Sequence, residues 1–221
     1  MPDAQAVLAR LRALADPANV EGMARFGIRP AKPLGVSVTT LRKLARPLGK
    51  DHALARDLWA SGFHEARILA TMVDEPAKVT RAQMDRWAKA FDSWDVCDQA
   101  CANLFDKTPF AVEKAVEWSA REREFEKRAG FALMAALAWH DKDAPDSTFR
   151  AFLPHVRRGA RDERNFVRKA ASWALRQTGK RNAALHALAL KEARALAEGD
   201  DKAARWVGRD AMRDLERRRP A

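Results

Sequence analysis

Aromatic residues recur in the second half of the chain at an interval of about forty residues. Phe125, Phe166 and Trp206 are 41 and 40 residues apart, and each is followed three positions later by a basic residue. A period of this length is typical of HEAT and armadillo units, in which each helix pair buries its apolar face against its neighbours. The repeat therefore predicts a helical solenoid, with each aromatic ring turned toward the core and each basic residue toward one edge or the concave surface.

The rest of the chain predicts the same fold class. Runs of alternating β-branched residues are nearly absent, and apolar residues at spacings of three and four predict helices near 4–14, 40–48, 52–59, 65–73, 81–91, 94–105, 109–119, 125–139, 145–156, 165–175, 183–197 and 202–215. Asp51, Thr80 and Asp200 are candidate N-caps, and Gly179 suits a helix C-terminus. We expect an all-α protein, a right-handed superhelical solenoid of HEAT-like or armadillo-like repeats in a single domain over residues 1–221.

Composition limits the kinds of protein that this chain can be. Its 221 residues, 47% of them hydrophobic, can bury a core without disulfides or metal. Cys97 and Cys101 lie four apart on one predicted helix, which is poor disulfide geometry and half of a tetrahedral metal site, so we expect buried free thiols. No apolar run reaches the roughly 18 residues of a membrane span, and the first residues do not resemble a signal peptide. We expect a cytoplasmic protein with no membrane association.

The charge is strongly positive and unevenly distributed. Lys and Arg number 41 against 30 Asp and Glu, a formal net charge of +11. Basic residues exceed acidic residues by 3 up to Phe110 and by 8 from Ala111 onward. Such a concentration favours a surface that binds a phosphate backbone, although an acidic protein would also suit it. The alternative is an arginine-rich composition with no binding role.

Trp94 and Asp98 are separated by four residues on a predicted helix. This spacing places an indole ring and a carboxylate one above the other, an arrangement that suits a cationic guest. Asp95 lies about 100° further around the helix and is not expected to face the same guest. The alternative interpretation makes Trp94 a core anchor and Asp98 a solvated or capping acid.

Four segments carry a family likeness: GVSVTTLR at 35–42, HEAR at 64–67, the stretch from Trp94 to Asp98, and ASWALR at 171–176. In these segments the chain is similar to the AlkD-like DNA alkylation repair family of HEAT-repeat DNA glycosylases. The resemblance implies a C-shaped solenoid whose concave, basic surface holds duplex DNA. It also implies excision of cationic alkylpurines, chiefly 3-methyladenine and 7-methylguanine, from a nucleotide left largely stacked rather than turned into a deep pocket.

The resemblance assigns catalysis to Trp94, Asp98 and Trp173. It assigns the phosphate near the lesion to Arg128, with Arg123 and Lys127 as neighbouring alternatives. Core packing is the alternative for Trp173, and a solvated helix face is the alternative for each cation. Further contacts with the DNA backbone are expected from Lys169, Arg168, Arg176 and Arg209.

These residue types match the chemistry that the family performs. An alkylated purine is a cationic leaving group, and the sugar approaches an oxocarbenium ion, which a fixed carboxylate and π-surfaces stabilise. We therefore expect a DNA glycosylase without metal or cofactor, acting as a monomer on duplex DNA of any sequence and needing no protein partner. His64 with Glu65 resembles half of a zinc motif, but no second His follows at helical spacing. The alternatives are a duplex or branched-DNA binder without turnover and a HEAT-like scaffold for an acidic protein.

Overall fold

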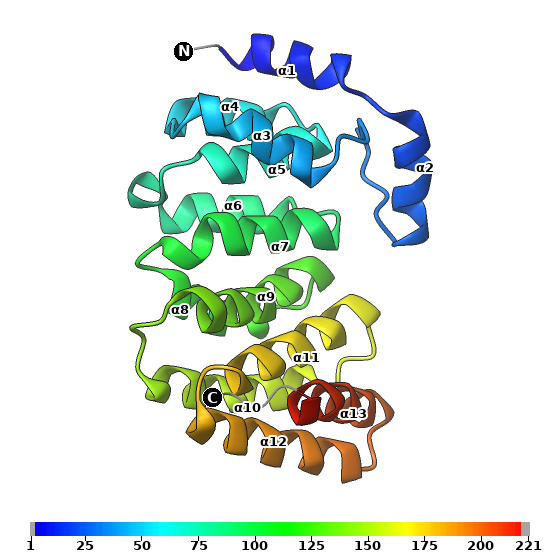
Figure 1. The fold of residues 1–221 in the computed structure, drawn as a ribbon, viewed down its shortest axis with the longest axis vertical. Coiled ribbons are helices and arrows are strands. Elements are labelled where there is room, and N and C mark those ends of the chain that lie inside the picture. The colour runs from blue at the N-terminus through cyan, green and yellow to red at the C-terminus, as the bar shows by residue number, and fades with distance from the viewer. Residues whose placement is uncertain (1–2, 218–221) are drawn as a thin grey trace. The chain divides into compact units, whose positions relative to one another are not determined.

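The computed structural model describes residues 3–217, which are helical and contain no β-strand, so the all-α prediction is confirmed (Figure 1). Within the same residues no helix combines the length and apolar character that crossing a membrane requires. The helices are α1 (Ala4–Ala13), α2 (Pro17–Arg25), α3 (Val38–Leu48), α4 (His52–Ala60), α5 (His64–Val73), α6 (Arg81–Lys89), α7 (Trp94–Asn103), α8 (Ala111–Ser119), α9 (Glu124–His140), α10 (Asp146–Gly159), α11 (Asn165–Gly179), α12 (Ala183–Glu198) and α13 (Lys202–Arg217), with 3₁₀ turns η1 (Pro76–Lys78) and η2 (Phe105–Lys107).

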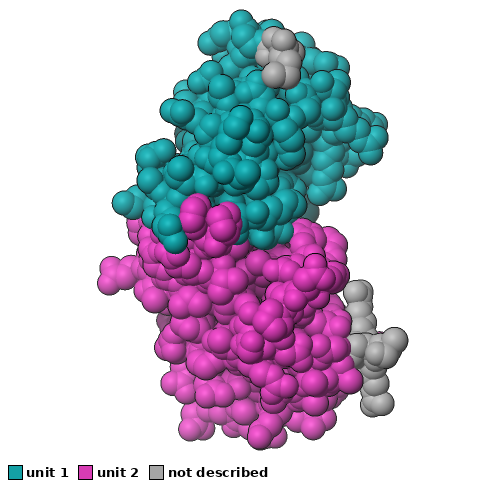
Figure 2. Space-filling model, turned by 90° about the vertical axis from the view of Figure 1, so that its left-hand side faces the viewer, with its two compact units in different colours: residues 1–108 teal, residues 109–221 magenta. Residues whose placement is uncertain are grey.

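The chain divides into two compact units, Met1–Thr108 and Pro109–Ala221, which are coloured separately in Figure 2. In the first unit, α3 packs on α5 and α5 packs on α7. Helix α4 covers α5, and Trp59 of α4 stacks on Trp87 of α6 with ring centroids 3.9 Å apart. The first unit is thus built from neighbouring helices that bury their apolar faces against one another.

The second unit repeats this arrangement with longer helices. Helix α9 packs on α11 and α11 on α13, while α8, α10 and α12 each pair with the helix that follows. Two glycines permit close helix contacts. A Cβ at Gly130 would lie 2.3 Å from the Ser119 nitrogen, and a Cβ at Gly208 would lie 2.4 Å from the Ala197 nitrogen. Larger residues there would push the paired helices apart.

Helix α2 was not predicted from the sequence. None of its residues is buried, which distinguishes it from the other α-helices within residues 3–217. It begins at Pro17, directly after Asp16, whose carboxylate accepts a hydrogen bond from the Asn19 backbone at 3.0 Å. It also runs in a different direction from α3, α4 and α5 (Figure 1).

The helix ends mostly follow the predicted caps. Asp51 and Thr80 each accept a hydrogen bond from the backbone N–H three residues on, at 3.0 and 3.2 Å, which confirms both. Helix α11 ends at Gly179, as predicted. The prediction that Asp200 caps α13 is wrong. The next residue, Asp201, immediately precedes the helix and accepts the capping bond at 2.7 Å.

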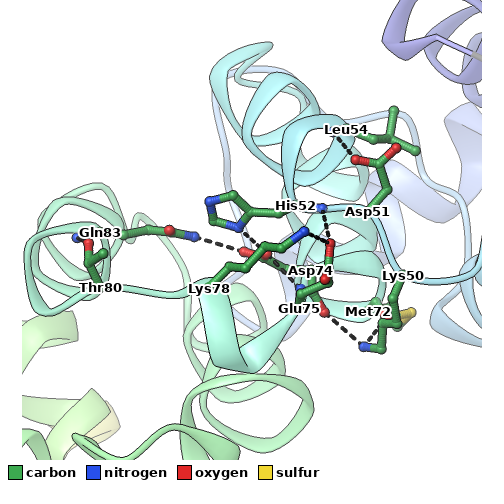
Figure 3. Close-up of polar contacts among 10 residues, drawn as sticks. All are labelled: Lys50, Asp51, His52, Leu54, Met72, Asp74, Glu75, Lys78, Thr80 and Gln83. Carbon is green, nitrogen blue, oxygen red and sulfur yellow. Dashed lines mark hydrogen bonds and ion pairs between the residues drawn. The ribbon is translucent and has the colours of Figure 1, made fainter.

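A buried carboxylate fixes the junction of α4, α5 and α6 in the first unit (Figure 3). Asp74 is fully buried at the end of α5, and its oxygens lie 2.7 Å from His52 Nδ1 and 2.7 Å from Gln83 Nε2. Lys50 donates to the carbonyl oxygens of Met72 and Asp74 at 2.8 and 3.0 Å. These bonds tie the first turns of α4 and α6 to the last turn of α5.

Candidate nucleic-acid interface

Helix α7 carries the first two candidate residues. Trp94 and Asp98 are both half-buried and lie one turn apart, because a helix returns to the same side after four residues. The indole and the carboxylate therefore share the partly exposed side of α7. The opposite side faces the core and consists of Val96, Cys97, Ala100 and Cys101.

The two cysteines are free and buried, which confirms the prediction for them. Burial raises the pKa of the Cys101 thiol well above its usual value, and the nearby charge of Asp98 raises it further. Cys101 is therefore a neutral thiol that packs in the core.

Trp94 is oriented by a segment that lies far away in the sequence. Its Nε1–H donates to the backbone oxygen of Phe26 at 3.0 Å, so the residue that ends α2 contacts the first residue of α7. The indole has a single polar donor, and this bond uses it. The bond fixes the direction in which the indole N–H points.

Asp95 points away from that side of α7 and contacts His64 of α5. The His64 Nε2 and Asp95 Oδ2 atoms are 2.8 Å apart, and the two side chains are 2% and 14% exposed. Burial disfavours the imidazolium, but the hydrogen bond and the charge of Asp95 outweigh it and raise the pKa of His64. Burial likewise opposes ionisation of Asp95, yet the bond from His64 lowers the pKa of that carboxyl. The pair is thus an internal ion pair.

Glu65, next to His64, has a structural role. It is 1% exposed and accepts hydrogen bonds from the backbone nitrogens of Leu34 and Gly35 at 2.8 and 2.6 Å. The backbone nitrogen of His64 also donates to the Lys32 oxygen at 3.0 Å. Glu65 and His64 therefore hold the segment that joins α2 to α3. No group of three or more His, Cys, Asp or Glu side chains within residues 3–217 is placed to hold a metal ion.

In the second unit, the three candidates for the lesion phosphate differ in exposure. Arg128 is 6% exposed, and its Nη1 donates to the Phe166 oxygen at 2.6 Å, which joins α9 to the first turn of α11. Lys127 lies 2.9 Å from the carboxylate of Asp162. The side chain of Arg123 is 68% exposed. Arg128 and Lys127 therefore support the fold, whereas Arg123 reaches solvent.

Trp173 lies half-buried on α11, beside a small polar network. The adjacent Ser172 is buried and donates to Asp210 of α13 at 2.6 Å. Arg176, one turn on from Ser172, lies 3.7 Å from the same carboxylate. The network fixes α11 against α13 at the level of Trp173.

The remaining cations fall into two kinds. Arg168 lies over the ring of Trp206 at 5.2 Å and is half-buried. Lys169 and Arg209 are exposed, and neither has a carboxylate partner among the residues that the structure describes. Lys169 and Arg209 are therefore the predicted cations with the most freedom to meet a phosphate.

The repeated aromatic residues do not face the core, so that prediction is wrong. Phe125 and Phe166 are half-buried and pack on each other with centroids 5.7 Å apart, and Trp206 is 36% exposed. The buried positions fall one residue later, at Val167 and Val207, because each residue turns the helix by about 100°. The aromatic rings instead pack along the first turns of neighbouring helices.

A family model described as DNA alkylation repair enzyme matches residues 7–215. The chain belongs to the DNA alkylation repair family. A relative from Listeria innocua serovar 6a, Uncharacterized protein Lin0241, is 25% identical over 190 residues, which cover 84% of this chain and 83% of that protein.

A solved structure shows the same fold as this member of the DNA alkylation repair family. It represents a family of proteins described as related to the HEAT-like repeat DNA glycosylases, with affinity for branched DNA structures. The TM-score is 0.80 at 18% sequence identity, and the match covers 100% of this chain and 99% of that one. The predicted HEAT-like class of fold is confirmed.

Sequence reasoning missed several residues that shape the site in this family member. The contact of Phe26 with Trp94 spans 68 residues, and the pairing of His64 with Asp95 spans 31. Neither separation along the sequence matches a helical spacing, so helical periodicity could not reveal either contact. The HEAR segment at 64–67 could have indicated such contacts. Adjacent His and Glu side chains on a helix predicted to face the core need buried hydrogen-bond partners.

Proposed function

We propose that this chain is a DNA-alkylpurine N-glycosylase that releases positively charged alkylated purines from duplex DNA. The observation that carries the proposal is that Asp98 shares the partly exposed side of α7 with Trp94, on a helix with no basic residue in a chain of net charge +11. A protein that only binds phosphates gains nothing from such a helix, because carboxylates repel phosphates. An enzyme with a cationic transition state gains from it.

The reaction that this helix suits is dissociative. Alkylation at N3 or N7 makes the purine a cationic leaving group, so the electron pair of the N-glycosyl bond leaves with the base, which becomes neutral. The sugar gains positive charge, and water then adds to its C1′ atom and releases a proton to solvent. The Asp98 carboxylate stabilises that charge, and the π-face of Trp94 stabilises it through the ring quadrupole. The hydrogen bond from Trp94 to the Phe26 oxygen orients the indole before the substrate binds, so the reaction does not have to supply the entropy cost of ordering that side chain.

Trp173 completes the proposed set of catalytic residues. The family resemblance assigns it a contact with the deoxyribose. Its half-buried position on α11 and the fixed Ser172–Asp210 bond beside it are consistent with a preorganised aromatic surface.

The positive side chains of the second unit are proposed to bind the DNA backbone. Lys169 and Arg209 are exposed and contact phosphates directly. Arg168 and Arg176 lie beside protein partners and add positive potential at the same surface. For the lesion phosphate, Arg128 stays the residue implied by the resemblance. The partner is duplex DNA of any sequence, bound by one copy of the chain without metal or cofactor.

The second candidate function is DNA binding without turnover. It is favoured by the structural neighbour, whose family is described as having affinity for branched DNA structures. The two functions share the cations of α11 and α13, but only the enzyme requires an acid on the side of α7 that carries Trp94.

The deciding experiment measures free base. The purified chain is incubated with duplex DNA methylated by dimethyl sulfate, and released 7-methylguanine is quantified by chromatography. We expect release above the spontaneous rate. Binding without release supports the second candidate, and absence of both binding and release contradicts both candidates.

A further inference from the structure

Phe26 is the most exposed large hydrophobic side chain among residues 3–217, at 70%. Its backbone is nevertheless well held. Gly27 adopts a φ of 75°, and its N–H donates to the Ala24 oxygen at 3.1 Å, while the N–H of Ile28 donates to the Met23 oxygen at 3.1 Å. These two bonds form the Schellman motif that ends α2. The ring is therefore carried outward by an ordered turn.

The turn is also anchored to the helices that bear the candidate site. The backbone oxygen of Phe26 accepts the indole N–H of Trp94 at 3.0 Å. Further along the same segment, buried Glu65 accepts the backbone N–H groups of Leu34 and Gly35. A buried carboxylate is costly unless it is bonded in this way, so the segment and α5 stabilise each other. The position of Phe26 relative to Trp94 is fixed.

The residues around Phe26 are positively charged. Positions 25–32, called the Phe26 loop, contain Arg25, Arg29 and Lys32 and no acidic residue. Arg25 and Arg29 are exposed, and neither has a carboxylate partner within the described part of the chain. Single exposed apolar residues are common on protein surfaces, but an aromatic ring on an ordered turn among cations without carboxylate partners is what nucleic-acid stacking platforms use. The cations hold phosphates, and the ring holds a base.

We propose that the Phe26 loop stacks on a nucleobase exposed at a break in duplex DNA, such as a gap. This inference rests on the proposed function in that the ligand is DNA. Within a continuous duplex each base is covered on both faces by its neighbours. The exposed phenyl ring could therefore stack on a base only by separating two stacked base pairs. At a gap one base face is open, and stacking costs little. The bond to Trp94 then places the break beside α7.

The test compares two DNAs of equal length and sequence, one continuous and one lacking a single nucleotide. Binding is measured by fluorescence anisotropy at fixed salt. We expect the chain to bind the gapped DNA at least about fivefold more tightly, the lower end of the range for stacking on one base. Phe26→Ala should bring the ratio close to one and leave affinity for continuous duplex unchanged. Phe26→Trp should restore the preference.

Trp139→Ala is the matched control, because that aromatic ring is 55% exposed but belongs to the second unit. It should keep the preference for gapped DNA. If Phe26→Ala keeps it too, or if the unaltered chain has none, the inference is overturned, while duplex binding agrees with both candidate functions. Failure of the unaltered chain to bind either DNA contradicts the proposed function itself. The inference is also overturned if Phe26→Ala weakens binding only to phosphatidylserine vesicles.

Discussion

Helices α7 and α11 each present a half-buried tryptophan, but in opposite electrostatic settings. Helix α7 carries Trp94 with two acidic residues and no basic one. Helix α11 carries Trp173 with three basic residues and no acidic one. An indole beside carboxylates suits a cation, whereas an indole beside guanidinium and ammonium groups suits a polyanion. We therefore propose that the charged groups of the two helices differ in role: the carboxylate of α7 serves the chemistry, and the cations of α11 bind the DNA backbone.

A second difference lies in how each helix uses its charges. On α7 one acid, Asp95, is an internal partner of His64, and the other, Asp98, shares its side with Trp94. On α11, Arg176 lies near Asp210, and Lys169 is exposed without such a partner. Like-charged neighbours on one helix thus differ in setting: Asp95 and Arg176 contact charged partners on other helices, whereas Asp98 lies beside Trp94 and Lys169 is exposed.

The largest expected effect on folding comes from the internal acid of α7. Asp95→Asn removes the charge that His64 requires, and it should lower the free energy of unfolding by about 2 kcal/mol at pH 6. Urea denaturation followed by circular dichroism measures the change. Asp92→Asn is the control, because this side chain is 37% exposed and its ion pair with Arg67 is 3.4 Å long, so the loss should be well under about 1 kcal/mol. Equal losses would show that the His64–Asp95 pair does not stabilise the fold.

In the second unit, Arg128 and Arg123 can be used to distinguish a structural role from a DNA-binding role. Arg128→Ala removes the hydrogen bond that Arg128 donates to the Phe166 oxygen and should cost about 1.5 kcal/mol of stability, in addition to weakening DNA binding. Arg123→Ala, at a side chain that is 68% exposed, should change thermal stability little. Parallel melting curves and DNA titrations distinguish the two. If only Arg123→Ala weakens binding, Arg123 is the residue that holds the phosphate.

The unpaired cations should govern the salt dependence of DNA binding. Lys169→Ala and Arg209→Ala should each weaken duplex affinity a few-fold and reduce the slope of log affinity against log salt by up to about one unit. Arg176→Ala should reduce the slope less, because Asp210 already neutralises part of its charge. Anisotropy titrations at several salt concentrations measure the slopes. An equal or larger change for Arg176→Ala would contradict the division into paired and unpaired cations.

The smallest effect expected is the pH dependence of the His64–Asp95 pair. The raised pKa of His64 gives stability that is present below about pH 6.5 and is lost as pH rises through its folded pKa. The lowered pKa of Asp95 gives stability that is present above about pH 4 and is lost as pH falls through its folded pKa. The stability difference between the unaltered chain and Asp95→Asn should be largest near pH 5 to 6 and about 1 kcal/mol smaller at pH 9. A difference that does not vary with pH would show that His64 is uncharged in the folded protein.

The helical architecture could be predicted because it depends on local pattern. Apolar residues at helical spacing located twelve of the helices, and capping residues such as Asp51 and Thr80 located their ends. Helix α2 was not predicted, although Asp16 and Pro17 are ordinary signals of a helix start. The aromatic repeat indicated a helical repeat of about forty residues but placed the wrong residues in the core. The buried positions lie one residue later, and each residue turns the helix by about 100°.

The candidate site could be predicted only in part. The spacing of Trp94 and Asp98 placed them on one side of α7, because that relation lies within a single helix. The partner of Asp95 and the contact of Trp94 with Phe26 depend on how separate helices pack, and sequence spacing carries no record of it. The same holds for Arg128, whose burial follows from the approach of α11.

We propose that the carboxylate beside Trp94 serves catalysis, and single-turnover excision of 7-methylguanine by Asp98→Asn is the sharpest test of that role. Excision should slow by at least about 30-fold, equivalent to about 2 kcal/mol in the barrier, while duplex affinity holds or rises. Asp95→Asn, assayed at a temperature where it is folded, should slow excision much less. If the unaltered chain releases the base and Asp98→Asn releases it equally fast, Asp98 has no catalytic role.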